Sequence, residues 1–480
     1  MTVIAAPATV VPHYSDTPRR SESDWVANLV LYMPLIGVTF LAKLAFAMGS
    51  SEIIIGVPMI LAALLLGILT GRLKPHPKRF AVYLMVMAVM VALSVFAAPE
   101  FIGSSLTLVL LVPLAASFQL HGAGLDSSVH QKRILDFALF FCLVGIAQYL
   151  GQFVIGPRLA YPIDNFGPQG FVSITKNYNA LIPIRYGAST LKANGVFLLE
   201  PSYYSQTLAA GFALEATGPR RLTRLGCFCA GFVVAYSGTG LLMLAAALPV
   251  LIIAEKRYDI LAYMMVIGIL LLALAKPLGL EVFLDRANEF GSTRSSGYMR
   301  YIGGWHLFEQ YLWPYPERAL FGMGSGMMFR STPWPLFFVA ETGWVKILIE
   351  FGLVGFVTYF GFLFYCIFSS RQSLTVRACV AVTPLLSGIL DPWSHALMLG
   401  LLVWMPPKAD FLQQQNQGDP ARNPHPLDAA KGEPVHVDAA AGPMQSPSPR
   451  RQPQPSRTRT QVGHGPGPGP GPGPGKRLSS

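Results

Sequence analysis

Charge is scarce in this 480-residue chain. Asp, Glu, Lys and Arg together make up 13% of it, where an ordinary soluble protein has roughly a quarter. Cysteine is rare too, and its five positions are scattered through apolar segments, which excludes a disulfide framework and a thiolate metal site. No cleavable signal peptide is visible, because the first apolar run starts near Trp25 and is long enough to span a membrane. These deficits exclude a soluble globular enzyme.

Long apolar runs are what the chain has instead, since 52% of its residues are hydrophobic. About 20 apolar residues cross the roughly 30 Å hydrocarbon core of a bilayer as a helix. The sequence therefore predicts an all-α polytopic membrane protein with about 12 transmembrane helices. The expected spans are 26–48, 53–70, 80–98, 102–120, 134–155, 201–217, 222–236, 240–254, 258–275, 344–368, 377–390 and 396–406.

Basic residues in the short loops predict how these spans are oriented, because cytoplasmic loops carry an excess of Lys and Arg. With the N-terminus in the cytoplasm, the external turns 49–52, 99–101, 237–239 and 391–395 contain no Lys or Arg. Both termini are then expected in the cytoplasm, and the long loops 156–200 and 276–343 are external. The internal segments hold Arg19, Arg20, Arg72, Lys74, Lys78, Arg79, Lys132, Arg133, Arg220, Arg221, Arg224, Lys256, Arg257, Arg371 and Arg377.

The same reading divides the chain into three parts. Residues 1–25 form a cytoplasmic N-terminal segment, residues 26–406 the polytopic membrane domain, and residues 407–480 a Pro/Gly-rich cytoplasmic tail. The tail holds 15 of the 39 prolines and lacks apolar runs, so we expect it to be disordered. The net charge of +11 gives no cluster of basic and aromatic residues of the kind that binds nucleic acid.

Four segments beside or within the external loops carry more information than their charge. Residues 192–206 read KANGVFLLEPSYYSQ and residues 236–241 read YSGTGL. Residues 296–326 begin SGYMRYIGGW and end LFGMGSG, and residues 341–355 read ETGWVKILIEFGLVG. Together and in this order they resemble the Wzy-type polysaccharide polymerase and O-antigen ligase family over roughly residues 190–370.

That resemblance implies a bacterial inner-membrane glycosyltransferase that uses an undecaprenyl-diphosphate-linked glycan, with no cofactor and no metal. Lys192 lies where the family usually has Arg before an x-x-Gly-x-Phe segment, and Arg300 matches the Arg that precedes Trp305. Glu341 stands where ligases commonly have His, nine residues before Glu350, which favours a polymerase over a lipid A-core ligase.

The reaction itself indicates which residue types to seek. An acceptor hydroxyl must lose a proton, and a diphosphate must leave with its charge neutralised. We therefore expect the catalytic group to be Glu341 or Glu200, with His306 as a further candidate, all in or beside the external loops. Each carboxylate could instead stabilise the start of a helix. The candidates for diphosphate binding are Arg300, Lys192, Arg185 and Arg294, because guanidinium binds phosphate bidentately and lysine supplies a single charge.

The sequence thus favours a polymerase of lipid-linked oligosaccharide repeat units that makes an exopolysaccharide or O-antigen-type polymer at the periplasmic face. The expected partners are that lipid-linked substrate, membrane lipid, a flippase and a chain-length regulator, but no nucleic acid. Two alternatives stay open. One is a ligase that transfers finished glycan to lipid A-core or a protein, and the other is a transporter or flippase of the lipid-linked oligosaccharide. Against a transporter stand the lack of internal repeats and the scarcity of charge within spans.

Overall fold

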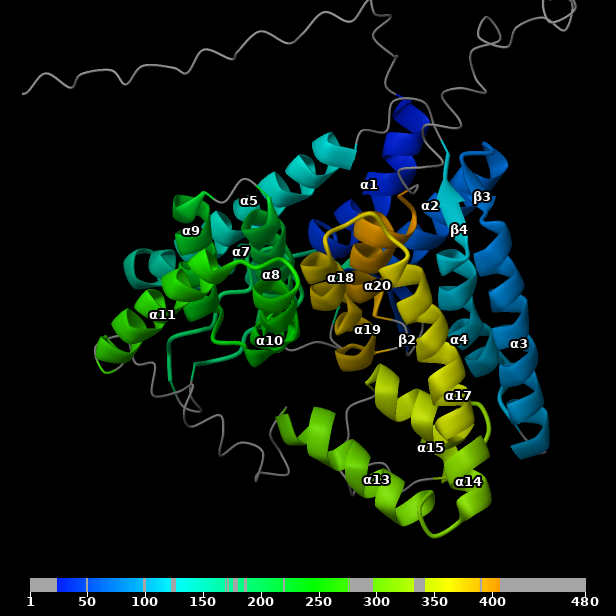
Figure 1. Cartoon of the computed structure of the whole chain (residues 1–480). Coiled ribbons are helices and arrows are strands. Elements are labelled where there is room, and N and C mark those ends of the chain that lie inside the picture. The colour runs from blue at the N-terminus through cyan, green and yellow to red at the C-terminus, as the bar shows by residue number, and fades with distance from the viewer. Residues whose placement is uncertain are drawn as a thin grey trace, which may run out of the picture. The chain divides into compact units, whose positions relative to one another are not determined.

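The computed structural model describes residues 24–48, 51–97, 101–121, 127–168, 170, 172–175, 180–184, 188–218, 221–274, 276, 297–331, 342–388 and 391–405. All of them belong to one compact unit, Met1–Pro420. The described part is mostly helical (Figure 1), as the composition predicts. The predicted N-terminal segment, apart from its last residues, and the predicted tail lie outside the described residues.

Each of the twelve predicted spans contains a helix. Two spans near the C-terminus are each divided between two short helices: Pro384 lies in the first turn of a new helix in the first of them, and an α-helix passes into a π-helix after Met398 in the second. In chain order the elements are α1 (Trp25–Thr39), α2 (Gly56–Leu69), α3 (Pro77–Ala97), α4 (Gly103–Ala116), α5 (Ser127–Val154), α8 (Pro201–Thr217), α9 (Leu222–Ala235), α10 (Gly238–Ile253), α11 (Tyr258–Ala273), α17 (Gly343–Phe368), α18 (Leu374–Ala381) with α19 (Thr383–Leu386), and α20 (Pro392–Met398) with the π-helix η2 (Leu399–Val403).

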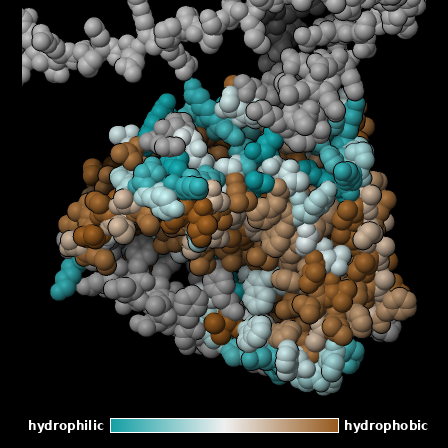
Figure 2. All heavy atoms as spheres, viewed as in Figure 1, coloured by the Kyte–Doolittle hydropathy of each residue, from teal (hydrophilic) through white to brown (hydrophobic). Residues whose placement is uncertain are grey.

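Three of these helices are long and apolar enough to cross a membrane: α3, α5 and α17, with mean hydropathies of 2.5, 1.9 and 2.0. Many of their large apolar side chains are exposed, among them Phe96 (88%) at the end of α3 and Val154 (84%) at the end of α5. In Figure 2 apolar residues form a broad band, with hydrophilic residues gathered above and below it. Large exposed apolar surface of this kind indicates contact with lipid.

The expectation of an all-α fold needs one correction, because short strands lie beside the helices. Strands β1 (Leu44–Met48), β2 (Ser51–Ile54) and β5 (Val172–Ile174) form an antiparallel sheet in the order β2-β1-β5. Strands β3 (Leu73–Pro75) and β4 (Phe118–Leu120) pair at another place. The first predicted span, 26–48, therefore ends as a helix at Thr39 and continues as a strand.

This boundary changes the interpretation of Lys43, which the sequence places inside the first span. Lys43 lies beyond the end of α1, and its ammonium forms an ion pair with Asp164 at 2.6 Å. Both side chains are buried, with 2% and 4% exposed. Asp164 lies in α7 (Pro162–Phe166), one of two short helices of the first predicted external loop, after α6 (Pro157–Ala160).

Polar contacts join segments that the basic-residue bias predicts to be on the same side. On the predicted outer side, Thr175 Oγ1 donates to Glu52 Oε2 (2.9 Å), and the Ile102 N–H donates to the Ser325 carbonyl (2.8 Å). On the predicted inner side, Thr375 Oγ1 donates to Glu255 Oε1 (2.8 Å). Further inner-side contacts are Arg224–Asp136, Arg72–Asp24, Gln131–Gln372 and Leu120–Trp404. These contacts agree with the predicted sidedness.

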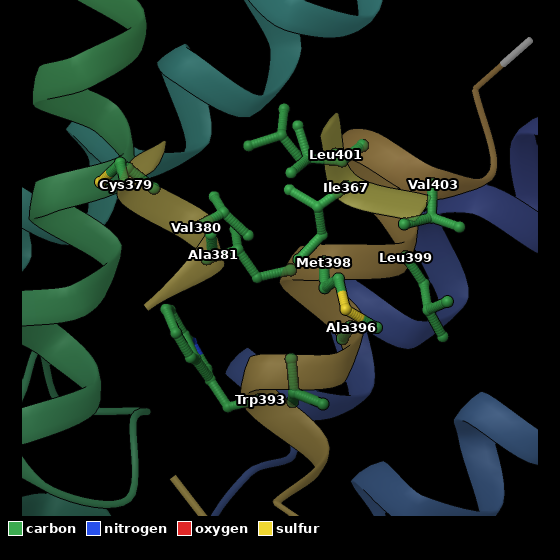
Figure 3. Close-up of a cluster of buried hydrophobic side chains, with 14 of the residues drawn as sticks. Ile367, Cys379, Val380, Ala381, Trp393, Ala396, Met398, Leu399, Leu401 and Val403 are labelled. Atoms are coloured by element: carbon green, nitrogen blue, oxygen red, sulfur yellow. The ribbon is translucent and has the colours of Figure 1, made fainter. Parts of the chain in front are cut away.

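Helix α8 lies at the centre of the packing, since Pro201–Ala216 are all buried. It contacts α5, α9, α10 and α18. The same core of buried apolar side chains continues where α17, α18, α20 and η2 meet (Figure 3). The residues labelled there are Ile367, Cys379, Val380, Ala381, Trp393, Ala396, Met398, Leu399, Leu401 and Val403.

Candidate active site

Two of the four informative segments, 192–206 and 236–241, lie against each other. The backbone N–H of Ala193 donates to the Val234 carbonyl (3.0 Å), at the end of α9. The N–H of Gly240 donates to Ser205 Oγ (3.1 Å) in α8. A Cβ at position 240 would collide with the Ser205 carbonyl, so glycine is required for this close approach of α10 to α8.

The other two segments, 296–326 and 341–355, also meet. Helix α17 is interrupted at Gly352, whose φ is +65°. The interruption leaves the carbonyls of Ile349 and Glu350 outside the regular helical ladder. They accept hydrogen bonds from Met323 N–H (3.0 Å) and Gly324 N–H (2.9 Å). The Gly-rich loop that follows α14 (Pro316–Phe321) is therefore fixed to a membrane helix by its backbone.

Glu200 and Arg300 join the two halves of this arrangement. Arg300 Nη2 lies 3.5 Å from Glu200 Oε2, and the side chains are 27% and 14% exposed. One comes from the first predicted external loop and the other from the second, 100 residues later. Two residues that the sequence proposes for different tasks, a base and a diphosphate ligand, therefore face each other at a partly accessible place.

The start of α8 explains the position of Glu200. Pro201 occupies the first turn, where its missing N–H has no cost, and Glu200 precedes it in an extended conformation. The Glu200 side chain makes no capping hydrogen bond to the helix backbone. It accepts a hydrogen bond from Ser202 Oγ (2.9 Å) instead. Glu200 nevertheless lies at the N-terminus of α8, where a carboxylate charge is favoured, as the alternative expects.

Arg300 is presented by the π-helix η1 (Tyr298–Ile302), which leads directly into α13 (Gly303–Tyr311). Trp344 Nε1, in the first turn of α17, donates to the Arg300 carbonyl (3.3 Å). Glu309 is not the partner of Arg300, because it contacts Trp305 and His306; the ion pair that Arg300 makes is the one with Glu200.

Lys192 occupies a different environment from Arg300, since it is buried with 7% of its surface exposed. Its N–H donates to the Ile182 carbonyl (2.9 Å), and its carbonyl accepts from the Tyr161 hydroxyl (2.9 Å). Burial raises the pKa of Tyr161, so this hydroxyl stays a donor at physiological pH. Lys192 is thus part of the packed loop that supports Glu200.

Sequence reasoning missed two glutamines that position this loop. Gln148 and Gln152 are one turn apart on α5 and buried. Gln148 bonds the side chain and N–H of Asn194 (2.9 and 3.0 Å) and the N–H of Val196 (3.2 Å). Gln152 bonds the N–H and carbonyl of Leu191 (2.8 and 3.1 Å). The sequence pattern that could have revealed them is two glutamines four residues apart inside an apolar run. Polar side chains within a membrane span are commonly functional.

The remaining candidates fall into two groups. His306 is 46% exposed, and its Nδ1 lies 3.3 Å from Glu309 Oε2, so it forms part of another cluster on α13. Glu341, Arg185 and Arg294 lie outside the described residues.

Helix α17 also carries a buried ion pair. Lys346 Nζ and Glu350 Oε1 are 2.9 Å apart, as the i, i+4 spacing predicts, with 7% and 0% of the side chains exposed. Within the described ranges, no three His, Cys, Asp or Glu side chains come together as a metal ion would require.

The chemistry that this arrangement supports follows from its charges. A carboxylate able to accept a proton lies beside a guanidinium able to hold an anion, and both are reachable from the predicted outer side. No family model matches the chain, and no similar sequence is found among curated proteins.

Proposed function

We propose that this protein is a multi-pass inner-membrane glycosyltransferase that polymerises lipid-diphosphate-linked oligosaccharide repeat units at the periplasmic face, with about twelve spans and both termini in the cytoplasm. The observation that carries the proposal is the Glu200–Arg300 pair, in which residues of both predicted external loops meet at 3.5 Å. The resemblance of the four segments to polysaccharide polymerases supports it, as does their convergence on this pair.

In the proposed step, a sugar hydroxyl of one repeat unit attacks the anomeric carbon of another. The new C–O glycosidic bond forms as the bond between that carbon and the diphosphate oxygen breaks. Glu200 takes the hydroxyl proton, and Arg300 neutralises the charge that develops on the departing lipid diphosphate. Such a base contributes about 10²–10⁴-fold to a rate.

The geometry suits both tasks. Ser202 donates a hydrogen bond to Glu200 and Arg300 forms an ion pair with it, and together they hold the carboxylate in one orientation. A guanidinium has five N–H donors, so Arg300 can face Glu200 through Nη2 and still bind phosphate oxygens.

The test uses substitutions in cells that make the polymer. Losing a charge-assisted hydrogen bond costs about 1.5–3 kcal/mol, so Arg300→Ala should reduce polymer at least tenfold. Arg300→Lys should recover part of this, because charge remains but the fork does not. Glu200→Gln should reduce polymer further at unchanged protein abundance. Arg158→Ala, an exposed arginine beside the Phe166 ring, serves as the matched control and should leave polymer unchanged.

Two results would contradict the proposal. Normal polymer from Arg300→Ala at normal abundance would remove Arg300 from the site. A deletion strain that accumulates full-length polymer on the lipid carrier, rather than single repeat units, would identify a ligase.

A further inference from the structure

An exposed row of aromatic rings continues from Arg300 along α13. Trp305 stacks on Phe308 (ring centroids 5.1 Å apart, planes 26° apart), and Phe308 contacts Trp313 at 5.7 Å. Trp305 is 50% exposed and Trp313 is 71% exposed. Large aromatic side chains are usually buried or placed at a binding surface, so this aromatic row of Trp305, Phe308 and Trp313 requires an explanation.

The packing of α13 does not account for the exposure of the two tryptophans. The apolar side of the helix is occupied by Leu307 and Leu312, both fully buried in a small core with Val345 and Ile349 of α17. Phe308 packs only partly against this core. Both indoles therefore remain on the outside after the helix has buried its apolar face.

Polar groups flank the row in a way that indicates the ligand. The Trp305 indole N–H donates to Glu309 Oε1 (2.9 Å), and Glu309 is itself 54% exposed at its side chain. His306 lies against the other oxygen of the same carboxylate. A sugar ring has an apolar C–H face and a rim of hydroxyl groups, so it matches aromatic faces bordered by a hydrogen-bonding carboxylate.

We propose that the aromatic row binds the glycan portion of the substrate. The identity of this ligand rests on the proposed function. Residues 298–311 are helical without a break, and the nine residues of α13 extend about 13 Å. A glycan whose diphosphate lies at Arg300 can therefore run along α13, with sugar rings stacked on Trp305 and then on Trp313.

A membrane-surface role is the competing explanation, since Trp and Tyr are common at bilayer interfaces. Exposed charges on the same stretch, at Glu309, Glu317 and Arg318, exclude insertion of the row into the hydrocarbon core, and quenching by lipid distinguishes an interfacial position from a glycan site. In Figure 1, α13 and α14 lie together beside the N-terminal part of α17.

The experiment uses the full chain in lipid nanodiscs. The probe is a mixture of short oligosaccharides from partial hydrolysis of the surface polysaccharide of the cells that produce this protein. Saturation-transfer NMR and tryptophan fluorescence report binding. Trp305→Ala and Trp313→Ala should each weaken it roughly two- to tenfold, as expected for one aromatic contact. Trp25→Ala is the matched control, because Trp25 is also 71% exposed but lies at the start of α1.

Three outcomes would overturn the inference. The first is no binding by the wild type, and the second is wild-type binding by both Trp305→Ala and Trp313→Ala. The third is quenching of the Trp313 fluorescence by dibrominated lipids, which would place the row in the bilayer; that fluorescence is the signal of the wild type minus the signal of Trp313→Phe. Binding needs no turnover, so it separates the two proposals. Oligosaccharide binding that depends on Trp313, together with normal polymer in Arg300→Ala cells, would refute only the proposed reaction.

Discussion

The buried Lys43–Asp164 pair makes the stability of the protein depend on a contact between the end of α1 and the first external loop. With 2% and 4% of the side chains exposed, neither charge has water to replace its partner. Removing one member of a buried pair costs about 3–5 kcal/mol, because the other charge stays desolvated. We therefore expect Asp164→Asn and Lys43→Met each to lower the free energy of unfolding by about that amount.

The double variant Lys43→Met/Asp164→Asn should be far less damaging than the sum of its parts. It removes both charges, so no charge is left desolvated without a partner, which is the cost of each single change. In this double-mutant cycle, the double variant should therefore be several kcal/mol more stable than the sum of the two single losses would make it. An SDS titration of the protein in dodecylmaltoside micelles, followed by far-UV circular dichroism, measures all four proteins.

The Lys43–Asp164 pair also predicts that the free energy of unfolding depends on pH. Burial lowers the pKa of Lys43 below its usual 10.5, and Asp164 opposes that shift. Between the lowered pKa and 10.5 the folded state binds fewer protons than the unfolded state, so the cost of burying the ammonium is relieved as pH rises. Without Asp164 the pKa falls further. The difference in the free energy of unfolding between wild type and Asp164→Asn should therefore be large at pH 7 and become smaller toward pH 10. A loss below about 1 kcal/mol, or a deficit independent of pH, would refute the reasoning.

Three further predictions concern topology, the tail and helix packing. Ser173→Cys should react with an impermeant thiol reagent from outside, and Ser448→Cys only after permeabilisation, because the basic residues predict opposite sides; external labelling at 448 would reverse the orientation. Truncation after about Lys408 should leave polymer nearly unchanged, since the tail lacks apolar content, and polymer loss from a stable truncation would show that the tail has a partner. Gly240→Ala should destabilise the protein by about 1–3 kcal/mol by forcing α10 away from Ser205, whereas Gly238→Ala, with open space around it, should have the melting temperature of wild type.

The sequence predicts the helices well because an apolar run long enough to span a membrane has few other stable conformations. It also predicts the Lys346–Glu350 pair, since that contact depends only on helical spacing. It predicts Glu200 and Arg300 as separate candidates and not as neighbours, because their contact depends on how two loops fold toward each other.

Contacts between distant segments account for the other differences. Asp136 follows Lys132 and Arg133 closely in the sequence but pairs with Arg224 of α9 at 3.0 Å. Lys43 lies beyond the end of α1 and pairs with a residue about 120 positions away. Both cases follow from tertiary packing, which hydropathy and charge bias do not encode.

The interruption of α17 at Gly352 has a consequence for variation among related sequences. The loop at Met323 and Gly324 is attached to α17 through backbone N–H groups and carbonyls, and a Cβ at Gly322 or Gly352 would collide with the facing backbone. The position of the polypeptide that follows Arg300 therefore depends on these glycines and on the buried Leu307 and Leu312, and not on its exposed side chains. Substitutions at Trp305, Trp313 and their neighbours can change what this surface recognises while the anchor and the Glu200–Arg300 pair stay in place. A protein built in this way can acquire a preference for a different glycan by a few exposed substitutions, without a new fold for the loop.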